Sequence, residues 1–392
     1  VLNMPLDTIS ASVDLGKLLI RHSRIDLSKE RYGIAAIALS NTGIRYDAGD
    51  KNRETEPLSH IELNNINIAC QDIEYTPDST RLELKRFNLI QPGGIRITNA
   101  STKLFADKEK LNVEELTINS KNGSYVKAST TLDWSSVFGN TGNMSAFLSL
   151  ALNKKDLKAL LTEEQFGALS LFENEMFRGR FAVNGNTSYM DVDTIDILIP
   201  SIADLQANGY ARNITAIDSL ETRLDLKSKS GDLRRLIGAE RNDSTPDVTI
   251  NAEGYVTYAA KAIATDLTAR GLGGNIATKA SYDINTERYE ADIDIKDINA
   301  GMLLDNVPLK EFTGKLLAKG KGFDIFGKST EYDVNLSIDT VIYDNIKLND
   351  IALHANQEKH QSNIALTSNS EYLKFNIEAN TELEPDNISN KT

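Results

Sequence analysis

The chain has 392 residues, of which 40% are hydrophobic and 25% are charged, and its formal net charge is -13 at pH 7. This composition is ordinary for a folded protein and argues against wholesale disorder. The negative charge argues against a nucleic-acid-binding function, because nucleic acid is held chiefly by clustered Lys and Arg side chains. The single cysteine, Cys70, excludes an intrachain disulfide and a multi-cysteine metal site.

The sequence contains no stretch that would span a bilayer as a helix. The longest uncharged stretch, residues 135–153, is interrupted by Gly139 and Gly142 and by polar residues between them. Its apolar part is therefore shorter than the roughly 20 residues that a spanning helix needs. The chain also starts at Val1 and shows no basic and apolar leader. We expect it to begin and end inside a longer protein, with any membrane anchor or export signal outside this segment.

Apolar and polar residues alternate in short runs, which is the period of a strand with one apolar face. In the first 120 residues the apolar residues change from odd to even positions, or the reverse, within several runs. We call such a change a parity slip. Three such slips lead from Ile61 and Leu63 to Ile66 and Ile68, from Leu82 and Leu84 to Phe87 and Leu89, and from Leu111 and Val113 to Leu116 and Ile118. We expect each slip to mark a turn, a bulge or a bend within one long strand, because otherwise the apolar face would flip to water.

Helical spacing is scarce. The strongest candidate covers residues 155–172, where leucines recur at spacings of three and four. Two shorter candidates cover residues 232–237 and 299–304.

The sequences of the helical candidates reveal an internal repeat. The hexapeptide that begins at Asp156 recurs at Asp232 and, more weakly, at Asn299, and Gly185, Gly254 and Gly322 recur at a similar spacing, each expected to close a strand. Both series indicate a unit of about 70 residues, made of a strand, a short helix, a linker and a run of strands. We therefore predict a β-rich N-terminal section and one continuous array of repeats. The predicted section covers residues 1–140, the array covers 141–392, and its repeats cover roughly 146–219, 220–288 and 289–380.

The last predicted repeat has the clearest alternation, with apolar residues two positions apart in three separate runs. Together the runs favour antiparallel β structure with one apolar face. The residues predicted to line that face are Val334, Leu336, Ile338, Ile364, Leu366, Leu373, Phe375 and Ile377.

A strand, the phrase Asp-Leu-x-x-Leu-Leu, a glycine-ended segment and a run of amphipathic strands together resemble the AsmA-like family, which includes the translocation-and-assembly-module B proteins of Gram-negative envelopes. The best-matching stretch covers residues 289–379. The resemblance implies a mainly β fold, in which an elongated, repeat-built antiparallel sheet with a few short helices is curled into a gutter lined by apolar side chains. It also implies a periplasmic location, an inner-membrane anchor outside this segment, and movement of phospholipid toward the outer membrane.

A minor feature points to the same class of organism. Triplets of Asp, then Ser or Thr, then an apolar residue or Thr resemble an O-glycosylation sequence of Bacteroidetes envelope proteins. They begin at Asp7, Asp78, Asp193, Asp218, Asp243 and Asp339.

An apolar sheet face must be covered by helices, by a second sheet or by a ligand. The helical segments are too few to cover it, which leaves two arrangements. In a sandwich, two such faces close on each other, and the alternation taken alone favours this. In an open trough, acyl chains cover the face, and the resemblance favours that. Burying hydrocarbon contributes about 0.8 kcal/mol per CH₂, so a dozen methylenes leaving a bilayer need roughly 10 kcal/mol of equivalent apolar contact.

Motifs for chemistry are weak. Residues 322–329 match the phosphate-binding pattern G-x-x-x-x-G-K-S, but strict alternation from Val334 predicts a strand where that motif requires a helix. The histidines, including His354 and His360, lack metal-ligand spacing. Cys70 lies in an alternating run and is predicted to be a packed thiol. We therefore predict no enzymatic activity, no cofactor and no metal site.

The expected partners are phospholipid acyl chains, with outer-membrane assembly components as a further class and membrane contact through parts outside this segment. The alternative function is an assembly factor for outer-membrane proteins that binds strands at a sheet edge, without carrying lipid. A carbohydrate-active β-rich enzyme is a third class of function that no motif supports.

Overall fold

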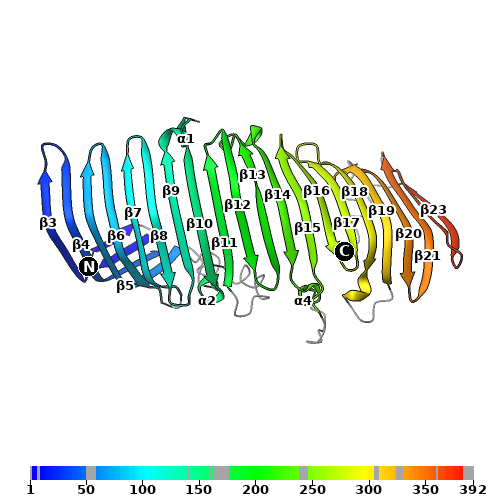
Figure 1. Cartoon of the computed structure of the whole chain (residues 1–392), viewed down its shortest axis with the longest axis horizontal. Coiled ribbons are helices and arrows are strands. Elements are labelled where there is room, and N and C mark those ends of the chain that lie inside the picture. The colour runs from blue at the N-terminus through cyan, green and yellow to red at the C-terminus, as the bar shows by residue number, and fades with distance from the viewer. Residues whose placement is uncertain are drawn as a thin grey trace. The chain divides into compact units, whose positions relative to one another are not determined.

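The computed structural model describes residues 2–6, 9–49, 59–92, 94–139, 141–158, 161, 176–237, 246–303, 309–323, 330–358 and 361–382. Strands make up most of these ranges, and short helices occur only at strand ends (Figure 1). The chain divides into two units, Val1–Pro200 and Ser201–Thr392.

The first unit is a meander of antiparallel strands. Strands β2 and β3 both pair with the long strand β4, β1 pairs with β2, and from β4 to β12 each strand pairs with the next. Its elements are β1 (Leu2–Leu6), β2 (Ile9–Asp14), β3 (Lys17–Asp26), β4 (Arg31–Ala48), β5 (His60–Thr76), β6 (Ser79–Ile90), β7 (Arg96–Asp107), β8 (Lys110–Ser120), β9 (Tyr125–Asp133), α1 (Trp134–Phe138), β10 (Met144–Asn153), α2 (Lys154–Lys158), β11 (Met176–Gly185) and β12 (Tyr189–Ile199).

The three predicted parity slips are β-bulges inside single strands. They lie in β5, β6 and β8, where the pairing register shifts between Asn64 and Asn67, between Leu84 and Phe87, and between Val113 and Leu116. In β5 and β8 the slip coincides with a residue in the left-handed region, Asn65 at φ 51 and Glu115 at φ 48. One extra residue on one strand restores the apolar side chains to the same face, so the strand continues without a turn.

The second unit is also an antiparallel meander, in which each strand from β13 to β23 pairs with the next. Its elements are β13 (Ala203–Arg212), η2 (Ile217–Ser219), β14 (Glu221–Ser230), α4 (Leu233–Leu236), β15 (Ile250–Ala259), β16 (Ala262–Gly271), β17 (Gly274–Asp283), β18 (Arg288–Asn299), η3 (Ala300–Met302), β19 (Leu309–Lys321), β20 (Glu331–Tyr343), β21 (Ile346–Glu358), β22 (Gln361–Asn369) and β23 (Lys374–Glu382). The prediction of a mainly β chain, built as an open antiparallel sheet with a few short helices, is confirmed.

The helices that carry the repeated hexapeptide follow β10, β14 and β18, which are four strands apart. The phrase at Asp232 forms α4 as predicted, and the phrase at Asn299 forms the 3-10 turn η3. Helix α2 covers the start of the longest helical candidate, residues 155–172. Residues 159–160 and 162–172 of that candidate lie outside the described ranges. The predicted repeat boundaries stay predictions.

The prediction that Gly254 closes a strand is wrong, because this residue lies inside β15. It adopts φ +150, and a Cβ atom built there would collide with the carbonyl oxygen of Asp266 on β16. Glycine is needed at this position because the neighbouring backbone comes too close for a side chain.

Within the described ranges, neither unit encloses a layered core. Every pair of strands with substantial contact is a pair of neighbours in the sheet. The few buried apolar side chains among the described residues are Ala48, Ile66, Leu89, Ala100, Ala151, Ala207, Val248, Leu272 and Val341. The sandwich arrangement, in which a second sheet would cover the apolar face, is therefore not adopted.

Candidate functional site

Pairing in the second unit aligns apolar side chains in rows across β17 to β23, because directly opposed residues of antiparallel strands point to the same face. The first row is Thr278, Ile293, Leu316, Leu336, Leu353, Leu366 and Ile377. The second row is Ala280, Ala291, Ala318, Val334, Ala355, Ile364 and Ala379. The third row is Ile276, Ile295, Gly314, Ile338, Ile351, Ser368 and Phe375. These three rows, here called the apolar face, contain no charged residue.

The eight residues predicted to line an apolar surface lie together on this side of the sheet. All but Leu373 belong to the three rows, and Leu373 directly precedes β23, two positions before Phe375. None of the eight is buried: Ile364 is 43% exposed, Leu373 45% and Ile377 55%. The others are half-buried. Protein atoms therefore leave a substantial part of this surface open.

The opposite face of the same strands is polar. Lys315 Nζ lies 3.0 Å from Asp292 Oδ1, and Lys319 Nζ lies 3.4 Å from Asp333 Oδ2. A hollow of about 610 Å³ over β15 to β20 is lined on this face by side chains that include Tyr255, Asp266 and Lys319. Since charged side chains pair across strands here and aliphatic ones align on the other side, the two faces suit different environments.

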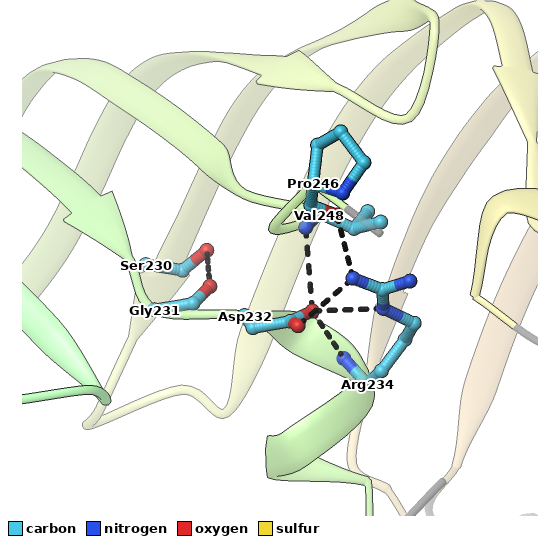
Figure 2. Close-up of polar contacts among 6 residues, drawn as sticks. All are labelled: Ser230, Gly231, Asp232, Arg234, Pro246 and Val248. Atoms are coloured by element: carbon cyan, nitrogen blue, oxygen red, sulfur yellow. Dashed lines mark hydrogen bonds and ion pairs between the residues drawn. The ribbon is translucent and has the colours of Figure 1, made fainter. Parts of the chain in front are cut away.

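At one edge of the second unit, Asp232 ties helix α4 to the start of the next strand (Figure 2). The residue is 4% exposed, and its carboxylate accepts hydrogen bonds from the backbone N of Arg234 at 3.2 Å and of Val248 at 3.3 Å. Arg234 Nη2 lies 3.0 Å from Asp232 Oδ2 and donates to the carbonyl of Pro246 at 2.6 Å. The hydrogen bond from Arg234 holds the pKa of Asp232 below its ordinary value.

Asp156, at the same position of the repeated hexapeptide, has a comparable role in the first unit. The residue is 3% exposed, and its carboxylate accepts hydrogen bonds from Ser120 Oγ and Ser124 Oγ, each at 2.5 Å, and from Asn122 Nδ2 at 2.7 Å. The donors belong to the turn between β8 and β9, so the carboxylate joins α2 to that turn. The repeated hexapeptide drew attention to both aspartates in the sequence. It did not indicate that each carboxylate is buried and accepts several hydrogen bonds that join neighbouring segments.

The other residues singled out in the sequence take ordinary positions. Cys70 lies opposite Ile37 and Leu84 in the pairing of β4, β5 and β6, is half-buried, and has a thiol whose pKa is raised by burial. The strand predicted from Val334 is β20. His354 Nε2 lies 3.3 Å from Asp333 Oδ1. His360, and residues 324–329 of the phosphate-loop pattern, lie outside the described ranges.

Within the described ranges, His, Cys, Asp and Glu side chains form no group of three or more that could hold a metal ion. No helix in this part of the chain combines the length and apolar character needed to cross a membrane. No protein-family model, no curated protein and no solved structure matches the chain.

Proposed function

We propose that this chain is the periplasmic section of an AsmA-like envelope protein, and that it shields phospholipid acyl chains during transport between the inner and outer membranes. Anchoring to the inner membrane would reside in parts of the protein outside this segment. One observation carries the proposal: the apolar face of the second unit is free of charge and, among the described residues, is left uncovered by helices or a second sheet.

Covering this surface with an apolar ligand has a lower free energy than leaving it in contact with water. Large aliphatic side chains that stay open to solvent lose the free energy that burial would provide, about 25 cal/mol per Å² of apolar area. An acyl chain laid on the rows recovers that free energy and at the same time keeps its own methylenes out of water. Since each row runs across the strands and neighbouring strands lie about 4.8 Å apart, a lipid could shift from strand to strand along the rows without losing contact.

The direct test is extraction of lipid from protein purified from cells without detergent, followed by mass spectrometry. We expect phospholipid to co-purify with the wild-type chain. Leu336→Asp places a carboxylate in the middle of the apolar face, and because burying an unpaired charge against hydrocarbon is costly, the bound lipid should fall several-fold. The matched control is Ser337→Asp, which adds the same group one position along, on the polar face.

Equal lipid content in the two variants, or wild-type content no higher than that of a soluble protein purified in parallel, would contradict the proposal. Circular dichroism of both variants checks that the sheet is retained.

A second candidate function is supported by the end of the sheet. Among the described residues, β23 pairs only with β22, so the other edge of β23 presents backbone donors and acceptors. Such an edge can add a strand from another protein. Crosslinking of an outer-membrane β-strand peptide to a photoreactive residue at Asn376 or Asn380, in protein that retains no lipid, would favour strand binding over lipid carriage.

A further inference from the structure

The two edges of the apolar face differ chemically. One edge, here called the tyrosine edge, consists of Tyr258, Tyr282, Tyr289 and Tyr332. These residues belong to a single cross-strand row, in which Ile263 separates Tyr258 from Tyr282 and Gly320 separates Tyr289 from Tyr332. The row lies next to the connections β15–β16, β17–β18 and β19–β20. Helix α4 and turn η3 follow strands that end at the opposite edge.

Contacts hold the tyrosine edge in place. The ring of Phe323 stacks on that of Tyr289 at 5.1 Å and lies 5.5 Å from that of Tyr282. The hydroxyl of Tyr332 lies 3.0 Å from Ser362 Oγ, and the row continues through the buried Gln357 to Ser362. Burial raises the pKa of Tyr289, and a protonated tyrosine hydroxyl can both donate and accept a hydrogen bond. This edge therefore offers aromatic rings with hydroxyl groups.

At the opposite edge, the row next to the apolar face consists of hydrocarbon side chains and runs from Ile298 through Phe312 and Val341 to Leu348. Tyr343 lies in the row beyond it, paired with Leu309 and Ile346. Register shifts in β18 and β20 bring these side chains back to the apolar face, as the bulges of the first unit do for theirs. We call this row the hydrocarbon edge.

On the basis of the proposed function, we propose that the tyrosine edge receives the polar end of a bound phospholipid and that its acyl chains run toward the hydrocarbon edge, so that each lipid lies along the strands. Tyrosine suits a boundary between polar and apolar groups, because its ring is apolar and its hydroxyl forms hydrogen bonds. The strand from Tyr332 to Val341 spans about 30 Å. The acyl chains of one leaflet occupy about half of a hydrocarbon core of roughly 30 Å, so they fit within that length.

The test uses tryptophan fluorescence in the full chain. The native tryptophan is removed by Trp134→Phe, and one new tryptophan is introduced by Tyr332→Trp at the tyrosine edge or by Phe312→Trp at the hydrocarbon edge. The probe is phosphatidylcholine that carries a nitroxide either on the headgroup or near the end of one acyl chain. We expect the headgroup nitroxide to quench the tryptophan at position 332 about twofold more than that at 312, because the sites are about 30 Å apart. Moving the nitroxide to the chain end should remove that preference, because the chain end lies closer to the hydrocarbon edge.

The outcomes separate the two proposals. Equal quenching of both positions by the headgroup nitroxide, or stronger quenching at position 312, would overturn the assigned polarity and leave lipid binding intact. Absence of quenching by either lipid at either position would overturn the proposed function itself.

Hydroxyl removal gives an independent readout. Tyr289→Phe and Tyr332→Phe keep the rings, and each should weaken phosphatidylcholine binding about fivefold if its hydroxyl bonds the polar end. Tyr255→Phe is the matched control, because the Tyr255 ring lies on the polar face beneath the guanidinium of Arg223. Binding that is unchanged in both edge variants would contradict a hydroxyl contact with the lipid.

Discussion

Tyr289 lies directly over Gly320, its cross-strand partner. A Cβ atom built on Gly320 would come within 2.5 Å of the Tyr289 hydroxyl oxygen and would collide with the carbonyl oxygen of Glu331 on the next strand. The missing side chain thus makes the space in which the tyrosine ring rests between β18 and β20. The tyrosine edge depends on this space as much as on the tyrosines themselves.

Gly320→Ala should therefore destabilise the second unit. The backbone oxygen of Glu331 has little freedom to move, so we expect a loss of about 1–3 kcal/mol in the free energy of unfolding, as for other overpacked sites. Urea denaturation monitored by circular dichroism measures the loss. Gly33→Ala is the control, because a Cβ at Gly33 meets nothing within 4 Å, and similar losses for both variants would contradict the prediction.

The stability that Asp232 provides should depend on pH. Because its pKa is lowered in the folded state, the ionised carboxylate stabilises the fold above the ordinary value of 3.8, and protonation removes that contribution as the pH falls through the lowered pKa. Asp232→Asn should be less stable than wild type by about 1–3 kcal/mol at neutral pH. Below pH 3.8 the difference should shrink.

Urea denaturation of both proteins at several pH values tests this. The control is Asp225→Asn, which breaks an exposed pair with Arg223 and should cost less than about 1 kcal/mol at neutral pH. A difference between wild type and Asp232→Asn that is constant from neutral to acid pH would refute the assignment.

Asp156→Ala should destabilise the first unit by about 3 kcal/mol, because it leaves buried hydroxyl and amide donors without their acceptor. Asp156→Asn keeps one acceptor oxygen and should cost less. Thermal denaturation compares the two variants with Asp196→Ala, which removes an ion pair to the exposed Arg180. If Asp156→Ala were no more harmful than Asp196→Ala, the carboxylate would not be the link between α2 and the β8–β9 turn.

Cys70 offers a test of lipid on the first unit. Burial raises the pKa of its thiol, so at neutral pH less thiolate is present than in an exposed cysteine, and alkylation by a maleimide should be slower than in the urea-unfolded chain. The rate should rise with pH. Because Cys70 lies on the apolar side of β5, bound phosphatidylcholine should slow the reaction further, as measured by mass spectrometry. A rate unaffected by phosphatidylcholine would indicate that this side of the first unit does not hold lipid.

Much of the local structure could be predicted from the sequence. The alternation at Val334, Leu336 and Ile338 predicted both a strand and the side on which these residues lie, because successive side chains of a strand point to opposite faces. The phrase beginning at Asp232 predicted a helix at the correct place. Both signals act over a few residues of one segment, which is why they can be read without knowledge of the neighbours.

The tertiary structure decided what the segments do together. Alternation allowed a turn, a bulge or a bend at each parity slip, and only pairing with adjacent strands made them bulges, as at Asn65 and Glu115. The choice between a sandwich and an open sheet likewise depended on which strands meet. The tyrosine edge joins residues as distant as Tyr258 and Tyr332, and their alignment is set by cross-strand hydrogen bonds that no single segment encodes.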